Sequence, residues 1–117
     1  MWQAPQGQDE SSKPTTAEYG MTNRKSIPLY SGVRVYFPDA LAAIARVSHT
    51  GNEQHHAGEP LHWDRSKSTD DLDACDRHLT DHAKGEIFDT DGERHLAKAG
   101  WRIMAALQKE LERCKRE

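Results

Sequence analysis

Three stretches of the chain carry apolar residues at the spacing of one face of an α-helix, which restricts the fold to a helical class. The first stretch has apolar residues at positions i, i+3, i+4, i+7 and i+10: Phe37, Ala40, Leu41, Ile44 and Val47. Pro38 suits the first turn of this helix, because proline has a fixed φ and lacks an N–H that the first turn leaves unpaired. Gly51 costs a helix interior about 1 kcal/mol relative to alanine, so we expect a break or kink near it.

The second predicted helix begins near Ser68 or Thr69, whose side chains can cap a helix N-terminus. Acidic residues fill its first turn, where the helix macrodipole favours negative charge: Asp70, Asp71 and Asp73. Its apolar stripe contains Leu72, Cys75, Leu79 and Ala83. Gly85 is placed to end this helix.

The third and longest predicted helix follows the turn GEIFDTDG, with Asp91 as its N-cap. Its predicted buried face contains Leu96, Ala99, Gly100, Ile103, Leu107 and Leu111. We expect the last residues, QKELERCKRE, to form exposed helix that frays. The pattern as a whole predicts an all-α fold, a small bundle of about three main helices.

The residues before the first helix are predicted to form two different segments. Residues 1–24 are rich in Gln, Ser, Thr and Pro and have no helical or strand period, which predicts a flexible tail. Residues 25–36, KSIPLYSGVRVY, have strand-like patches that Pro28 and the pair Ser31-Gly32 interrupt. We therefore expect a short extended N-terminal segment, within a single helical domain that spans residues 25–117.

Composition narrows the function classes. The chain has 117 residues, a formal net charge of -3 and a mean hydropathy of -0.93. These values exclude a membrane span and provide no general basic field for nucleic acid. Cys75 and Cys114 are far apart in sequence, and no apolar run has the length of a secretory signal. We expect a reduced, cytoplasmic protein.

Histidine and aspartate are concentrated in one part of the chain. All seven histidines lie between His49 and His95, and eight of the ten aspartates lie between Asp64 and Asp91. Bringing charged and coordinating side chains together costs desolvation energy, so this concentration indicates a site with a metal, phosphate or counter-charge partner. A solvated polar loop beside a solvated helix is the alternative.

Two helix faces carry the charged candidates. At 100° per residue, Asp70, Asp73, Arg77 and Asp81 share the face of the second helix opposite its apolar stripe. This face is either part of a site or, through Asp73, Arg77 and Asp81, a surface ladder of ion pairs. On the third helix, His95, Lys98 and Arg102 form one basic stripe near the N-terminus, which suits phosphate or, alternatively, is a solvated edge.

The histidines also permit a zinc hypothesis. His78 and His82 have the i, i+4 spacing of metal ligands, and His55 or His56 could add a third ligand. No CxxC accompanies them, and the sequence lacks a P-loop, GxGxxG, GxSxG or HExxH motif. A zinc-binding helical domain and a non-catalytic helical interaction protein are therefore the two alternatives to an enzyme.

Four sequence elements resemble the phage dATP/dGTP diphosphohydrolase family (MazZ-like), which is related to the MazG-like all-α nucleotide pyrophosphohydrolases. These elements are GNEQHH, LHWDRSKS, RHL and the DG-RHLAK-W-R pattern, within a similarity that covers residues 25–112. One departure is that MazG-like enzymes carry paired ExxE and ExxD motifs. The corresponding helix positions here read DLDACDRHLTDH and ERHLAKAG.

The resemblance implies hydrolysis of purine deoxynucleoside triphosphates, dGTP or dATP, to the monophosphate and pyrophosphate. It implies a requirement for Mg²⁺ or Mn²⁺ and a role in adjusting the phage nucleotide pool in the host cytoplasm. The expected partner is the nucleotide substrate, with no nucleic acid and no membrane. Trp101, Ile103 and Met104 are hard to bury within one short chain, so we also expect a homodimer or tetramer.

Triphosphate hydrolysis needs hard cations, carboxylates that hold them, and basic side chains for the remaining charge. The candidate metal ligands are Glu53, Asp73 and Asp81, of which Glu53 and Asp81 are also the candidate catalytic residues. The candidate substrate-binding residues are His55, Trp63, Lys67, Arg77, His78, Lys98 and Arg102. Among these, Trp63 or His55 would stack on the base.

Overall fold

The computed structural model describes residues 21–116, with side chains for residues 24–114. Three α-helices form the body of the protein: α2 (Pro38–His55), α3 (Asp71–Ala83) and α4 (His95–Arg116). Within the described residues two short helical turns precede them, the 3₁₀-helix η2 (Met21–Ser26) and the π-helix η3 (Tyr30–Arg34). The described part of the chain has no β-strand and only one isolated bridge, between Phe88 and Arg94. The prediction of an all-α fold with three main helices is confirmed.

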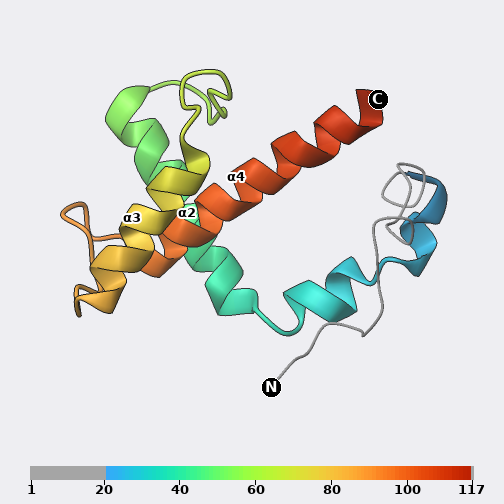
Figure 1. Ribbon diagram of the computed structural model, residues 1–117, viewed down its shortest axis with the longest axis horizontal. Helices are drawn as coiled ribbons and strands as arrows, with labels where there is room; N and C mark the ends of the chain where they lie inside the picture. Colours follow the sequence, from blue (N-terminus) through green and yellow to red (C-terminus); the bar gives the residue numbers. More distant parts are fainter. Residues whose placement is uncertain (1–20, 117) are drawn as a thin grey trace.

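Helix α4 is the centre of the arrangement, because both α2 and α3 pack against it (Figure 1). The buried apolar side chains of these contacts are small: Ala74, Cys75, Ala97, Ala99 and Ala105. Small side chains let helix axes approach closely. Gly100 marks the closest approach, since a Cβ at this position would lie 3.0 Å from Cδ1 of Ile44 on α2.

The large apolar residues that were predicted to be buried lie largely outside this core. On α3, Leu72 is 63% exposed, and on α4 Leu96, Ile103 and Leu107 are each about half exposed. The prediction is therefore wrong for these large residues in the single chain, whereas Cys75 and Ala99 are buried as predicted. The alanines beside these residues face the other helices instead, because they allow tighter packing, and a stripe of large side chains remains on the outside.

The helix ends follow local signals only in part. Pro38 starts α2, and Gly85 follows the end of α3 with a φ of +95°, as predicted. Helix α2 continues through Gly51 to His55, so the expected break is wrong; the buried Asn52 holds that turn in place. Neither Ser68 nor Thr69 caps α3, which starts at Asp71 after Asp70.

The N-terminal expectation of a short extended segment is also wrong. Residues 30–34 form η3, with hydrogen bonds from the Gly32 N–H to the Pro28 carbonyl and from the Val35 N–H to the Tyr30 carbonyl. No described strand is available to pair with this segment, so its backbone groups pair locally. In Figure 1 the η2 and η3 segment, in blue to cyan, projects away from the three-helix body. Most of the predicted tail, residues 1–20, lies outside the described residues.

No helix within residues 21–116 has the length and apolar character required to cross a membrane.

Candidate functional site

A cavity of about 660 Å³ lies between the C-terminal half of α2, the loop of residues 56–70 and one face of α4. Its volume falls within the usual range for small-molecule sites. Its lining combines aromatic rings with basic and acidic side chains, so the cavity can accept a ligand that has both a flat apolar part and a charged part.

Two tryptophans form the aromatic part of the lining. Trp63 in the loop and Trp101 on α4 meet edge to face, with ring centroids 5.8 Å apart. The Trp101 Nε1–H donates to Ser48 Oγ of α2 at 2.7 Å, which fixes the indole between the two helices. The Arg65 guanidinium lies 4.4 Å from the Trp63 ring centroid and forms an ion pair with Glu112. The loop is thus held against the C-terminal half of α4.

A buried carboxylate organises the basic part of the lining. Asp71 is 7% exposed and accepts hydrogen bonds from Arg102 Nη1 and Lys109 Nζ, each at 2.8 Å. Burial by itself would raise the pKa of Asp71, but the hydrogen bonds and positive charges of Lys109 and Arg102 outweigh it and lower this pKa. Both cations also bind Ser68, and they retain further N–H donors at the cavity.

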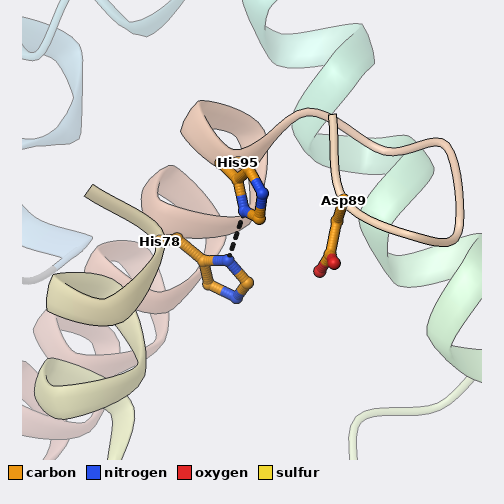
Figure 2. Close-up of side chains that lie close together, drawn as sticks. All are labelled: His78, Asp89 and His95. Carbon is orange, nitrogen blue, oxygen red and sulfur yellow. Dashed lines mark hydrogen bonds between the residues drawn. The ribbon is translucent and has the colours of Figure 1, made fainter. Parts of the chain in front are cut away.

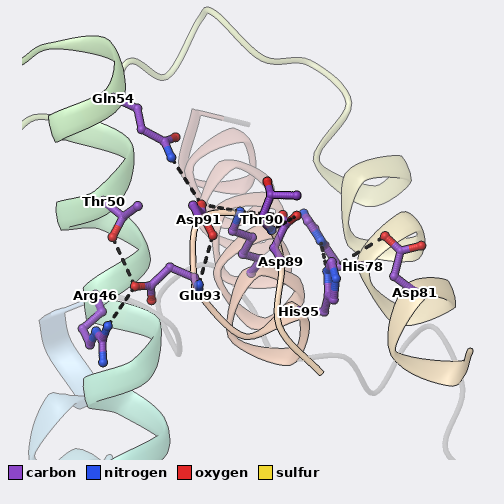
Figure 3. Close-up of polar contacts among 11 residues, drawn as sticks. Arg46, Thr50, Gln54, His78, Asp81, Asp89, Thr90, Asp91, Glu93 and His95 are labelled. Carbon is purple, nitrogen blue, oxygen red and sulfur yellow. Dashed lines mark hydrogen bonds and ion pairs between the residues drawn. The ribbon is translucent and has the colours of Figure 1, made fainter. Parts of the chain in front are cut away.

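A second ion-pair group lies at the N-terminal end of α4 (Figure 3). Lys98 Nζ donates to Asp89 Oδ2 and Asp91 Oδ2, each at 2.7 Å. The hydrogen bond from Lys98 lowers the pKa of Asp89 to about 2. Burial by itself would lower the pKa of Lys98, but its two carboxylate partners raise it. Lys98 and Asp91 both line the cavity.

The loop that carries these aspartates is anchored to α2 by Glu93. This residue is 5% exposed, and its carboxylate accepts hydrogen bonds from Arg46 Nη2 at 3.1 Å and Thr50 Oγ1 at 3.2 Å. Asp91 adds a contact with Gln54 of α2 and accepts the Glu93 backbone N–H. These contacts, which Figure 3 shows together, fix the position of Asp91 relative to the cavity.

Two histidines meet beside this group (Figure 2). The Nδ1 atoms of His78 and His95 are 3.0 Å apart, so one imidazole donates its proton to the other. His95 is 3% exposed. Burial, followed by the positive charge of Lys98, lowers the pKa of His78. His78 lies at the edge of the cavity, and this lowered pKa favours its neutral form.

Asn52 brings an unpaired acceptor to the cavity. Its Nδ2 donates to the Glu59 carbonyl at 3.0 Å, whereas its buried Oδ1 has no hydrogen-bond partner among the described residues. A buried polar atom without a partner costs free energy, so this amide oxygen is available to a ligand that donates a hydrogen bond.

Six of the seven predicted substrate-binding residues line this one cavity: His55, Trp63, Lys67, His78, Lys98 and Arg102. Arg77 does not, because its exposed guanidinium binds Asp70 at 3.0 Å. Arg77 therefore pairs with Asp70 and not with Asp73 or Asp81, as the ion-pair ladder on this helix would require.

The predicted metal ligands are not brought together. Among the described residues, the clusters that could hold a metal are His78, Asp89 and His95, and an overlapping set of Asp81, Glu86 and His95. Glu53 and Asp73 belong to neither set and are both exposed. Mg²⁺ prefers oxygen ligands, and it is often held by one or two carboxylates together with substrate phosphates. Asp91, which lines the cavity and accepts a hydrogen bond from Lys98, offers an oxygen ligand of this kind.

Sequence patterns missed Asp71, Asp91 and Lys109 as parts of the site. Asp71 and Asp91 were assigned to helix N-termini, and Lys109 to an exposed end that frays. The Asp71 contacts cross 31 and 38 residues of sequence, to Arg102 and Lys109, so helix periodicity does not reveal them. The sequence signal for an aromatic lining is the presence of two tryptophans in the helical domain, Trp63, which was predicted to belong to the site, and Trp101.

The fold and cavity together define a small all-α domain with an aromatic, charge-paired ligand site. The chain belongs to the dATP/dGTP diphosphohydrolase family: residues 17–116 match the model described as "dATP/dGTP diphosphohydrolase, N-terminal". The family resemblance seen in the sequence is thereby confirmed. No curated protein and no solved structure matches the chain.

Proposed function

We propose that this protein hydrolyses purine deoxynucleoside triphosphates between the α and β phosphates, releasing the monophosphate and pyrophosphate. The observation that carries this proposal is the cavity itself, which places two tryptophans beside Lys98, Arg102 and Lys109. A nucleotide has the same division into a flat base and a charged chain. Family membership supports the same activity.

The base is assigned to the tryptophan side of the cavity. Trp63 offers a ring for stacking, and the unpaired Asn52 Oδ1 can accept a hydrogen bond from an exocyclic amino group, which both adenine and guanine carry. A site that leaves a 2′-hydroxyl without space or a partner would favour deoxynucleotides by roughly 100-fold. Equal turnover of GTP and dGTP would contradict this preference.

The phosphates are assigned to the basic side. Arg102 and Lys109 are oriented by Asp71 and Lys98 by the two loop aspartates, so their positive charges are fixed before a ligand arrives. Fixed cations stabilise charge that develops on the leaving pyrophosphate. Asp91 lines the same cavity, and in this proposal its carboxylate orients the attacking water.

Mg²⁺ or Mn²⁺ would be held by Asp91, which lines the cavity, together with the phosphates, and it would neutralise phosphate charge. Lys98 would then remain beside the phosphates as a further cation. The chain's own residues exclude bulk water through Trp63 and Trp101 and fix the triphosphate through their neighbouring cations.

The experiment that tests the function incubates the protein with each of the common dNTPs and NTPs in magnesium and measures pyrophosphate release. The matched variants are Arg102→Gln, at the cavity, and Arg77→Gln, an exposed arginine outside it. We expect dGTP or dATP turnover to fall by at least about 100-fold in the first variant and to be unchanged in the second. Absence of pyrophosphate with every nucleotide would contradict the function.

A homodimer, or a tetramer built from dimers, completes the proposal. The half-exposed Leu96, Ile103, Met104 and Leu107 of α4 and the exposed Leu72 of α3 provide apolar surface that a second copy can cover.

A further inference from the structure

Three elements place one nitrogen or oxygen ligand each around a single point. His78 comes from α3, His95 is the first residue of α4, and Asp89 comes from the loop between these helices (Figure 2). Their ligand atoms lie within 4.8 Å of one another. The loop is fixed by backbone hydrogen bonds from the His95 N–H to the Ile87 carbonyl and from the Asp89 N–H to the Glu93 carbonyl. The three side chains are thus held together without any ligand.

The spacing of the two imidazoles is close to that of two ligands of one cation. Two histidine nitrogens, each at the usual Zn–N distance and at a tetrahedral angle, lie about 3.3 Å apart. The Nδ1 atoms of His78 and His95 are 3.0 Å apart. Movement of the shared proton to Nε2 of the ring that carries it, with a small rotation of His78, would therefore convert this hydrogen bond into a pair of metal ligands.

We propose that His78, His95 and Asp89 form a binding site for a zinc-type divalent cation. Two imidazoles with one carboxylate match three-ligand zinc sites, which leave a fourth position open. Asp81 lies next to His95, with its Oδ2 3.9 Å from His95 Nδ1, and is therefore the nearby candidate for the fourth ligand (Figure 3). Two nitrogen ligands select against Mg²⁺, which distinguishes this site from the Asp91 carboxylate assigned to the nucleotide-bound cation.

Lys98 is the group that opposes a cation here, since its ammonium binds Asp89. It has a second partner in Asp91 at the same distance, so it keeps a full ion pair when Asp89 turns to the metal. The site also differs from the sequence hypothesis of a His78 and His82 pair. His82 is absent from both clusters. The histidine that lies beside His78 is instead His95, 17 residues further along the chain.

The test uses the full-length, untagged chain, stripped with a chelator and titrated separately with Zn²⁺, Co²⁺ and Mg²⁺ by calorimetry. We expect one Zn²⁺ or Co²⁺ per chain and visible Co²⁺ absorption with the intensity of a four-coordinate site. Mg²⁺ should bind at this site at least 100-fold more weakly. Absence of stoichiometric Zn²⁺ binding to the folded wild-type chain would overturn the proposal.

The variants locate the site. His78→Gln and Asp89→Asn should each weaken Zn²⁺ binding at least about tenfold. The control His49→Gln changes an exposed histidine of α2 that is in neither cluster, and its Zn²⁺ affinity should equal that of the wild type. Circular dichroism of each variant checks the helices. Equal affinities in His78→Gln and His49→Gln would overturn the assignment, whether or not the protein hydrolyses nucleotides.

Discussion

Individual carboxylates of this protein act as anchors between distant segments. Asp71 joins α3 to two turns of α4, Glu93 joins the 84–94 loop to α2, and Asp91 joins the same loop to Lys98 and Gln54. Removing one partner of a buried ion pair leaves an uncompensated charge, which costs more than the pair contributes. The site is therefore sensitive to single charge changes at these positions.

Asp71→Asn should make the free energy of unfolding less dependent on pH in the acid range. The pKa of Asp71 is lowered in the folded protein, so the unfolded chain takes up its proton first as the pH falls. The stabilisation by Asp71 is thus complete well above the ordinary aspartate pKa of about 4 and is lost progressively as the pH falls below it. We expect Asp71→Asn to cost about 1–3 kcal/mol at pH 7 and to approach the wild type as the pH falls below about 4. Thermal unfolding followed by circular dichroism across this range measures both; parallel pH profiles would refute the prediction.

Asp91→Asn and Glu53→Gln separate two locations for the catalytic carboxylate. Asp91 lines the cavity, whereas Glu53 is exposed on α2 outside its lining. We expect Asp91→Asn to reduce pyrophosphate release at limiting Mg²⁺ by at least about 100-fold, and Glu53→Gln to have the smaller effect. A collapse of turnover in Glu53→Gln alone would instead support the metal ligand expected from the sequence.

Among the elements, α4 determines the arrangement of the others. It contributes Lys98, Trp101, Arg102 and Lys109 to one cavity over about three turns, and it packs against α2 through the gap that Gly100 leaves. A change in the distance between α2 and α4 will therefore change the shape of the ligand site.

Gly100→Val tests this packing. Any Cβ at this position meets Ile44 Cδ1 at 3.0 Å, so the larger side chain must push α2 away or distort Ile44. We expect a loss of about 1–3 kcal/mol, measured by urea unfolding. The second change Ile44→Ala should recover part of this loss in the double variant. Additive effects of the two changes would show that they do not share this contact.

Sequence periodicity predicts these elements well where the signal is local and poorly where it depends on partners. Pro38 and Gly85 set helix ends through their own backbone geometry, and both were predictable. The inward face of α4 was not, because Leu96 and Ala97 both suit a helix and only the fit to α3 decides between them. Most basic and aromatic site residues were predictable by type, but the Asp71 partners depend on how the helices cross.

On the scale of the whole molecule, the distribution of apolar surface is uneven. The described core consists of small side chains, while Leu72, Ile103, Met104 and Leu107 are about half exposed or more. A small domain with little buried apolar surface has a narrow margin of stability. Covering this stripe with a second copy would supply the missing burial.

Ile103→Glu should dissociate the assembly. Light scattering at micromolar concentration should show a dimer or tetramer for the wild type, and a smaller species for this variant, because a charge at a buried interface loses its hydration. Leu29→Glu, on the segment before η3, is the matched control and should keep the wild-type mass. A wild-type monomer would contradict the proposed assembly.

The alanine-rich core has a thermal consequence. The heat capacity change of unfolding rises with the hydrocarbon surface that becomes exposed and falls with the polar surface. A core built from alanines together with the buried Asn52, Asp71, Glu93 and His95 releases little hydrocarbon and much polar surface. For a single chain, calorimetry should give a value below the usual 12–15 cal/mol/K per residue, and hence a flat curve of stability against temperature. Such a protein is weakly stabilised at its optimum and loses little of that stability on cooling.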